Sequence, residues 1–194
     1  MASTNRAIWR KFGIRTGDVL PYRASKGTRL DLCDLFGELG YKIGAEIGVE
    51  QGNYSLELCS RIAGLKLYCI DPYTTYFHHS AEEMGNVMKM AQDKVSKFNT
   101  EFIRKPSLDA VNDLPDGCLD FVYIDGMHDF DNVMRDIIVW APKVKSGGIV
   151  AGHDYSHRYG YGVVSAVDVY TKIHDIKSCY ITKELLDPSW LWVR

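Results

Sequence analysis

The stretch AEIGVEQGNYS, residues 45–55, decides the fold. Its apolar start predicts a strand, its two glycines predict a turn, and the residues after them predict a helix. Gly48 and Gly52 allow the backbone to adopt positive φ and to pass close to a ligand. Asn53 or Ser55 can open the helix, whose first N–H groups have no partner within the helix. We therefore expect a strand–turn–helix unit with a ligand at the turn; a tight turn without a ligand is the structural alternative.

Two acidic residues, Glu46 and Glu50, flank this turn. A dinucleotide site would need the pattern GxGxxG and would place a pyrophosphate at the helix N-terminus. The second and third glycines of that pattern are missing after Gly48, and carboxylates beside the turn repel a pyrophosphate. The sequence therefore favours a cationic ligand, and a dehydrogenase with a distorted nucleotide-binding pattern is a minor alternative.

Strands and helices alternate along the chain around this stretch. Predicted strands cover residues 42–49, 65–71, 101–105, 118–125 and 147–154, and predicted helices cover residues 28–39, 53–63, 81–98, 107–114, 131–144 and 163–173. Such alternation predicts a mostly parallel sheet with helices on both faces. The last two predicted strands, 176–182 and 189–194, have no helix between them, which predicts an antiparallel hairpin at one side of the sheet.

The N-terminal region differs from the rest of the chain. Residues 1–27 mix Arg, Lys, Gly and aromatic residues without a clear period, which predicts an irregular arm. A helix follows, with Thr28 as its cap and Gly40 as its stop. We therefore expect residues 1–40 to form an arm and helix that act as a cap or lid, and residues 41–194 to form one α/β domain.

Composition places the chain among ordinary globular proteins. It has 194 residues, of which 46% are hydrophobic and 25% charged, which excludes a disordered chain, a collagen and a coiled coil. With a formal net charge of -2 we expect no nucleic-acid partner and no membrane, and no apolar run approaches the roughly 20 residues of a spanning helix. The N-terminus has no apolar segment typical of a secretory signal. The five cysteines lack CxxC spacing, which predicts buried reduced thiols in a cytoplasmic protein.

Three predicted strands end in an acidic residue, namely Asp71, Asp125 and Asp154. The carboxyl ends of parallel strands share one edge of the sheet, where open sheets bind ligands. A carboxylate at Asp71 can accept hydrogen bonds from both hydroxyls of an adenosine ribose, and Pro72 and Tyr73 would then shape the adenine side. The structural alternative for Asp71 is a helix or loop cap.

Five segments in order carry a resemblance to a known family: EIGVEQGNYS, CIDPY, FIRKPSLDAV, LDFVYIDGMHDFDNVMRDI and VKSGGIVAGHDY. Together they resemble class I S-adenosylmethionine-dependent methyltransferases. The closer resemblance is to the small O-methyltransferases of methyltransferase family 24, which include cephalosporin-hydroxylase-like and macrolide-sugar O-methyltransferases. The resemblance covers roughly residues 40–194. It implies a Rossmann-like three-layer sandwich whose seven-stranded, mostly parallel sheet has a reversed terminal strand.

The resemblance also implies a cofactor site. Glu46, Gly48 and Gly52 would line the methionine end of S-adenosylmethionine. Asp71 would hold the ribose, and the adenine would lie beside Ser107 and Leu108. The full set of expected cofactor-binding residues is Glu46, Gly48, Val49, Gly52, Asn53, Tyr54, Ser55, Asp71, Pro72, Tyr73, Ser107, Leu108 and Asp125.

A divalent metal is implied as well, because relatives place ligands at the ends of the fourth and fifth strands. The matching residues are Asp125 and the pair His153–Asp154. Carboxylates favour Mg²⁺, whereas imidazole is a better ligand for Mn²⁺, Fe²⁺ or Zn²⁺. Three interpretations stay open: His153 does not ligate, the metal is softer than Mg²⁺, or the site is vestigial.

His128, three residues after Asp125, occupies the position that holds the base in the sugar O-methyltransferases. An alcohol must lose its proton as it attacks a sulfonium methyl group, and imidazole accepts protons near neutral pH. The structural alternative for His128 is a capping or sheet-edge histidine. His157 and the pair His78–His79 are weaker candidates, more typical of solvated loops.

We therefore expect an O-methyltransferase that acts on a hydroxyl group of a sugar, polyketide or phenol, with Asp125 and His128 as catalytic residues and a homo-oligomer as its assembly. The aromatic segment 72–85 would form part of the lid over the acceptor pocket, and segment 153–162 would form another wall of it, with a glycine-rich surface loop as the structural alternative. The alternatives are a non-catalytic S-adenosylmethionine-binding module and a nucleic-acid methyltransferase. The latter is disfavoured by the sequence IDGMH, which stands where base methyltransferases carry an (Asn/Asp)-Pro-Pro-(Tyr/Phe) motif.

Overall fold

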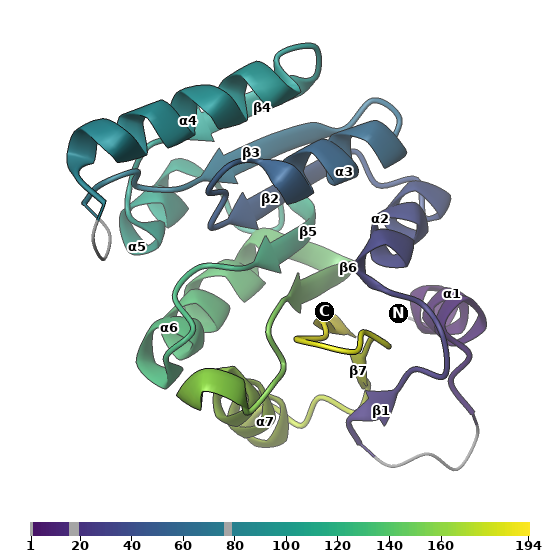
Figure 1. Cartoon of the computed structure of the whole chain (residues 1–194). Coiled ribbons are helices and arrows are strands. Elements are labelled where there is room, and N and C mark those ends of the chain that lie inside the picture. Colours follow the sequence, from purple (N-terminus) through teal and green to yellow (C-terminus); the bar gives the residue numbers. More distant parts are fainter. Residues whose placement is uncertain (1, 16–19, 76–78) are drawn as a thin grey trace.

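A mixed β-sheet forms the centre of the computed structural model, which describes residues 2–15, 20–75 and 79–194 (Figure 1). Over these residues the sheet has eight strands in the order β1-β7-β8-β6-β5-β2-β3-β4. The strands are β1 Tyr22–Arg23, β2 Ile43–Ile47, β3 Lys66–Ile70, β4 Asn99–Ile103, β5 Leu119–Ile124, β6 Val144–Gly152, β7 Cys179–Ile181 and β8 Trp190–Val193. The mostly parallel α/β sheet predicted from the alternation is confirmed, and so is the Rossmann-like fold class implied by the resemblance.

Seven α-helices of the described residues cover the sheet. They are α1 Ala2–Phe12, α2 Arg29–Glu38, α3 Asn53–Arg61, α4 Ala81–Val95, α5 Ser107–Ala110, α6 Phe130–Trp140 and α7 Val163–Ile173. Short 3₁₀ segments, Val111–Asp113 and Ala141–Lys143, extend α5 and α6, and a third covers Arg158–Gly160. Figure 1 shows α2 and α3 on one side of the sheet and α6 and α7 on the other.

The reversed strand is β8, which lies between β6 and β7 and runs antiparallel to both. The other strand pairs are parallel. The predicted hairpin at one side of the sheet is therefore confirmed. Parallel pairing also brings the carboxyl ends of β2, β3, β5, β6 and β7 to one edge, which we call the ligand edge.

The prediction of an irregular arm over residues 1–27 is wrong. This region contains α1 and β1, and β1 pairs with β7, so that the sheet has eight described strands instead of seven. Helix α1 buries Thr4, Ile8 and Phe12, which share one helix face at four-residue spacing. Ile8 and Phe12 belong to the same apolar cluster as the residues under α2, so the arm packs on the sheet. The division at residue 40 stays a prediction.

Helix α2 begins where the sequence predicted. The Thr28 side chain accepts a hydrogen bond at the helix N-terminus, and Asp31 bonds back to the Thr28 N–H at 2.8 Å. This capping box satisfies N–H groups that the helix itself leaves unpaired. Gly40, with φ of 72°, follows the helix. As a result, Arg29 is fixed as the first residue of α2.

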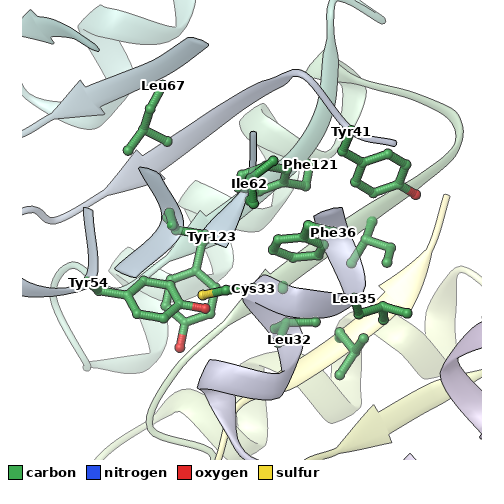
Figure 2. Close-up of a cluster of buried hydrophobic side chains, with 14 of the residues drawn as sticks. Leu32, Cys33, Leu35, Phe36, Tyr41, Tyr54, Ile62, Leu67, Phe121 and Tyr123 are labelled. Carbon is green, nitrogen blue, oxygen red and sulfur yellow. The ribbon is translucent and has the colours of Figure 1, made fainter. Parts of the chain in front are cut away.

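Two apolar layers hold the helices on the sheet. One lies under α1–α4 and includes the rings of Phe36 and Phe121, whose centroids are 4.2 Å apart (Figure 2). The other lies under α5–α7 and includes Trp140 and the stacked pair Trp190 and Trp192. Burial of each such side chain is worth about 1.5–3 kcal/mol.

The cysteine prediction is confirmed in that all five thiols are free, four of them buried and Cys118 half-buried. Among the described helices, none has the length and apolar character required to cross a membrane.

Candidate active site

The loop between β2 and α3 has the backbone geometry that its glycines predicted. Gly48 and Gly52 have φ of 85° and 70°. A Cβ atom on Gly48 would lie 2.2 Å from the carbonyl oxygen of Asp125, so only glycine lets this loop pass so close to the end of β5. Gly52 caps α3 without a side-chain hydrogen bond. The predicted strand–turn–helix unit is confirmed.

Asp71, directly after β3, anchors this loop. Its Oδ2 accepts hydrogen bonds from the N–H groups of Val49 and Glu50, both at 3.0 Å, and its Oδ1 accepts one from Tyr73 at 2.9 Å. We call Asp71 and these three N–H groups the loop anchor. Asp71 therefore acts as a loop cap, which was the structural alternative. Its two carboxylate oxygens can accept further hydrogen bonds, and the contact with a ribose stays a prediction.

Tyr73 supports the loop as well. Its side chain is 1% exposed and its hydroxyl donates to the carbonyl of Glu50 at 2.9 Å. Arg104 donates to the carbonyl oxygens of Tyr73 at 3.0 Å and Pro72 at 3.4 Å. Tyr73 thus supports the glycine loop through its contact with Glu50. Its expected place beside the adenine stays a prediction.

Glu46 lies within β2 and is 1% exposed. The hydroxyl of Ser55 donates to its carboxylate. Burial raises the pKa of Glu46 to about 8, because a charged carboxylate is poorly solvated inside the protein. Glu46 and Ser55 therefore join β2 to α3 from within, and their contact with a cofactor stays a prediction.

The other predicted cofactor residues lie around the same edge. Ser107, the first residue of α5, donates to Asp136 at 2.5 Å and accepts from the indole of Trp140 at 2.8 Å. Leu108 beside it is 42% exposed. Asn53 accepts a hydrogen bond from Lys94 at 2.6 Å. The sheet therefore brings these residues to the ligand edge.

At the ends of β5 and β6, Asp125, His128 and Asp154 form what we call the ionic cluster. Nε2 of His128 lies 3.0 Å from Oδ2 of Asp154 and 3.8 Å from Oδ1 of Asp125. One ligand atom from each of the three residues lies within 4.8 Å of those of the other two. Asp154 has a positive φ of 58°, which non-glycine residues rarely adopt and which is found more often at functional sites.

His153 lies next to this group. Its Nδ1 is 3.3 Å from Oδ2 of Asp154 and 3.8 Å from Oδ1 of Asp125. The three residues that could jointly hold an ion include His128 in place of His153. The two predicted carboxylates are thus brought together, and the role of His153 stays a prediction.

A family model described as a methyltransferase domain matches residues 45–155, which is more than half of the chain. The chain belongs to this family of methyltransferase domains. The resemblance predicted from the five ordered segments is therefore confirmed, and the matched range contains both the loop anchor and the ionic cluster.

A curated relative of this methyltransferase domain is the Uncharacterized protein y4gI of Sinorhizobium fredii, which is 26% identical over 125 residues. The match covers 61% of this chain, but the chain spans only 14% of that relative's length.

Solved structures share the fold. The O-methyltransferase from Bacillus cereus in complex with SAH is similar with a TM-score of 0.65 and 13% identity, over 100% of this chain and 91% of the other. The O-methyltransferase TomG from Streptomyces achromogenes, involved in tomaymycin synthesis and solved with SAM, is similar with a TM-score of 0.63 and 13% identity, over 99% and 88% of the two chains.

In this methyltransferase domain the surroundings of His128 favour its protonated form. The nearby carboxylates of Asp125 and Asp154 raise its pKa to about 9, because both favour the imidazolium form. Burial raises the pKa of Asp154, but hydrogen bonds from His128 and His153 outweigh it and hold that pKa well below the usual range. The role of His128 as a base stays a prediction, and the raised pKa means that its neutral form gains population only at alkaline pH.

Two further outcomes concern the remaining histidines and one residue that no sequence pattern indicated. His78 lies outside the described residues, as does part of the expected lid segment 72–85, while His79 and His157 are exposed, as loop histidines would be. One residue of the site was missed: Arg29, whose Nη1 lies 3.7 Å from Oδ2 of Asp125. Arg29 precedes residues 45–155, which match the family model, and it belongs to no motif. No sequence pattern therefore indicated it.

Proposed function

We propose that this methyltransferase domain transfers the methyl group of S-adenosylmethionine to a hydroxyl group of a small molecule. The observation that carries the proposal is the ionic cluster, which stands at the ligand edge beside the glycine loop of a methyltransferase domain. The net charge of -2 supports a small acceptor over a nucleic acid.

The residues present fit this cofactor. Asp71 and Asp125 stand on opposite sides of β2, because β2 pairs with both β3 and β5. Acidic side chains suit the cationic sulfonium and ammonium groups. The loop after Gly48 brings backbone groups within reach of a ligand, and Asp71 retains acceptor capacity for ribose hydroxyls.

The ionic cluster also fits a divalent cation. The carboxylates of Asp125 and Asp154 would hold it, which suits Mg²⁺ as well as Mn²⁺ and leaves His128 beside the site as the base. When bound, such a cation makes a nearby hydroxyl more acidic.

The chain's own groups can move the acceptor's proton. As the acceptor oxygen forms its bond to the methyl carbon, the carbon–sulfur bond breaks and sulfur keeps the electron pair. The hydroxyl proton must then pass to a base, and neutral His128 can accept it while Asp154 stabilises the resulting imidazolium. Since the pKa of His128 is about 9, the neutral fraction, and with it the rate, rises with pH.

The test combines isothermal titration and turnover. The protein should bind S-adenosylmethionine and S-adenosylhomocysteine at micromolar concentrations and methylate at least one member of a panel of sugars, phenols and polyketides. Absence of binding at millimolar cofactor would refute the proposal.

The second candidate is a non-catalytic S-adenosylmethionine-binding module. The ion pair with Asp154, which helps to raise the pKa of His128 to about 9, favours it, because a charged imidazole cannot act as a base. Cofactor binding without methyl transfer to any acceptor from pH 7 to 10, with and without Mg²⁺ or Mn²⁺, would support this candidate.

A further inference from the structure

Arg29 is held in place at the ligand edge by several elements. It is the first residue of α2, behind the capping box of Thr28. Its N–H donates to the carboxylate of Glu184, in the β7–β8 loop, and its carbonyl accepts a hydrogen bond from the hydroxyl of Tyr54 at 3.2 Å. The backbone of Arg29 is therefore fixed before any ligand binds.

The guanidinium group is also oriented. Its Cζ lies 4.9 Å from the centre of the Tyr54 ring, and that ring packs against Tyr123 (Figure 2). Its Nη1 lies 3.7 Å from Oδ2 of Asp125, which is too long for a strong hydrogen bond. The side chain is 33% exposed, so a ligand can reach it.

Arg29 lies where the amino-acid end of the cofactor would bind. The order β5-β2-β3 places Asp71 and Asp125 on opposite sides of the glycine loop. A cofactor whose ribose lies at Asp71 extends its amino-acid end across β2 towards Asp125. Arg29 stands at that end, against Tyr54 in the first turn of α3.

The acidic residues of the ligand edge provide no partner for the carboxylate of the cofactor. These side chains, Asp71 and Asp125 among them, suit the sulfonium and ammonium groups of the cofactor but repel its carboxylate. Two other cations of the described residues near the loop are engaged: Arg104 with the carbonyl of Tyr73, and Lys94 with Asn53. The planar guanidinium of Arg29 is suited to bidentate binding of a carboxylate.

We propose that Arg29 binds the carboxylate of the methionine moiety of S-adenosylmethionine. This inference rests on the proposed function, since it requires that cofactor. It makes α2 a part of the cofactor site, although the family match begins only at residue 45.

The test compares two ligands that differ in the amino-acid moiety. S-adenosylhomocysteine carries it, whereas 5′-methylthioadenosine has the same nucleoside and a thioether but no carboxylate. In isothermal titration, Arg29→Gln should weaken S-adenosylhomocysteine binding about tenfold or more and change 5′-methylthioadenosine binding less than twofold. Arg29→Lys, which keeps the charge, should recover part of the loss.

Arg61→Gln is the matched control, because its guanidinium pairs with Glu57 and Asp34 on the helix surface. It should bind both ligands as the wild type does, and thermal melts should show that all variants fold. Equal weakening of both ligands by Arg29→Gln would overturn the inference, as would unchanged binding of S-adenosylhomocysteine. A wild type that binds neither ligand would refute the proposed function itself and the inference with it.

Discussion

Asp71, at the end of β3, accepts hydrogen bonds from backbone N–H groups, whereas Asp125 and Asp154, at the ends of β5 and β6, face the imidazole of His128. The donors of the loop anchor are uncharged backbone N–H groups, which no side-chain substitution other than proline removes. The ionic cluster instead joins two carboxylates to an imidazole, whose charge depends on a proton. The loop anchor thus fixes the backbone of the glycine loop, whereas the ionic cluster contains a side chain whose charge can change.

Removal of divalent cations should separate the loop anchor and the ionic cluster most strongly. If the ionic cluster holds a cation, EDTA should abolish methyl transfer, and Mg²⁺ or Mn²⁺ should restore it, as measured with radiolabelled S-adenosylmethionine. Binding of S-adenosylhomocysteine should persist in EDTA, because the loop anchor contains no cation. Full turnover in chelator would show that His128 works without one, and a preference for Mn²⁺ would point to an imidazole ligand.

His128→Ala should lower turnover by about 10²–10⁴, the usual contribution of a positioned base, and leave S-adenosylhomocysteine affinity within twofold. His157→Ala, an exposed histidine outside the cluster, is the control. Titration with Mn²⁺ separates two roles: a ligand's loss weakens Mn²⁺ binding, whereas a base's loss does not. Joint loss of cofactor binding and turnover would mean that His128 is structural.

Asp71→Ala should weaken S-adenosylhomocysteine binding by about tenfold or more, because it removes three charge-assisted hydrogen bonds from the loop along with the expected ribose contacts. The same change should lower the melting temperature by about 5–10 °C. Asp93→Ala, on the exposed face of α4, serves as control. A variant that melts and binds like the wild type would contradict both the anchor and the ribose contact.

The smallest expected effect is a pH dependence of stability, measured by thermal melts in EDTA. The folded-state pKa of His128 is about 9, above the ordinary value of 6.5, so the charged imidazole stabilises the fold fully below pH 6.5. This contribution is lost as the pH rises through 9, while the rate should increase over the same range. The melting temperature of the wild type should fall by a few degrees more than that of His128→Ala. Parallel curves for the two proteins would argue against the raised pKa.

The sequence predicted those parts of the molecule whose signals are local. The three strand-end acids follow β3, β5 and β6 as expected, because runs of apolar residues define buried strands and the residue after them is easily located. The capping box of α2 and the positive φ of Gly48 likewise depend on neighbouring residues.

What the sequence could not predict depends on distant partners. Strand β1 has two residues, too few for a pattern of alternation, and exists through its pairing with β7. Helix α1 did carry a signal in the spacing of Ile8 and Phe12, but basic residues between them obscured it. The protonated state of His128 follows from the distance to Asp154, which no spacing in the sequence encodes.

The pairing of β1 with β7 has a consequence for the order in which the protein is made. Tyr22 finds its strand partner in Tyr180, and the N-terminus of α2 receives the carboxylate of Glu184. These early segments can therefore take their final positions only after residues 180 and 184 have been synthesised. The glycine loop and its anchor can form well before that, from residues 43–73. A nascent chain would thus be able to form the glycine loop first and hold Arg29 in its final position only after residue 184 has been synthesised.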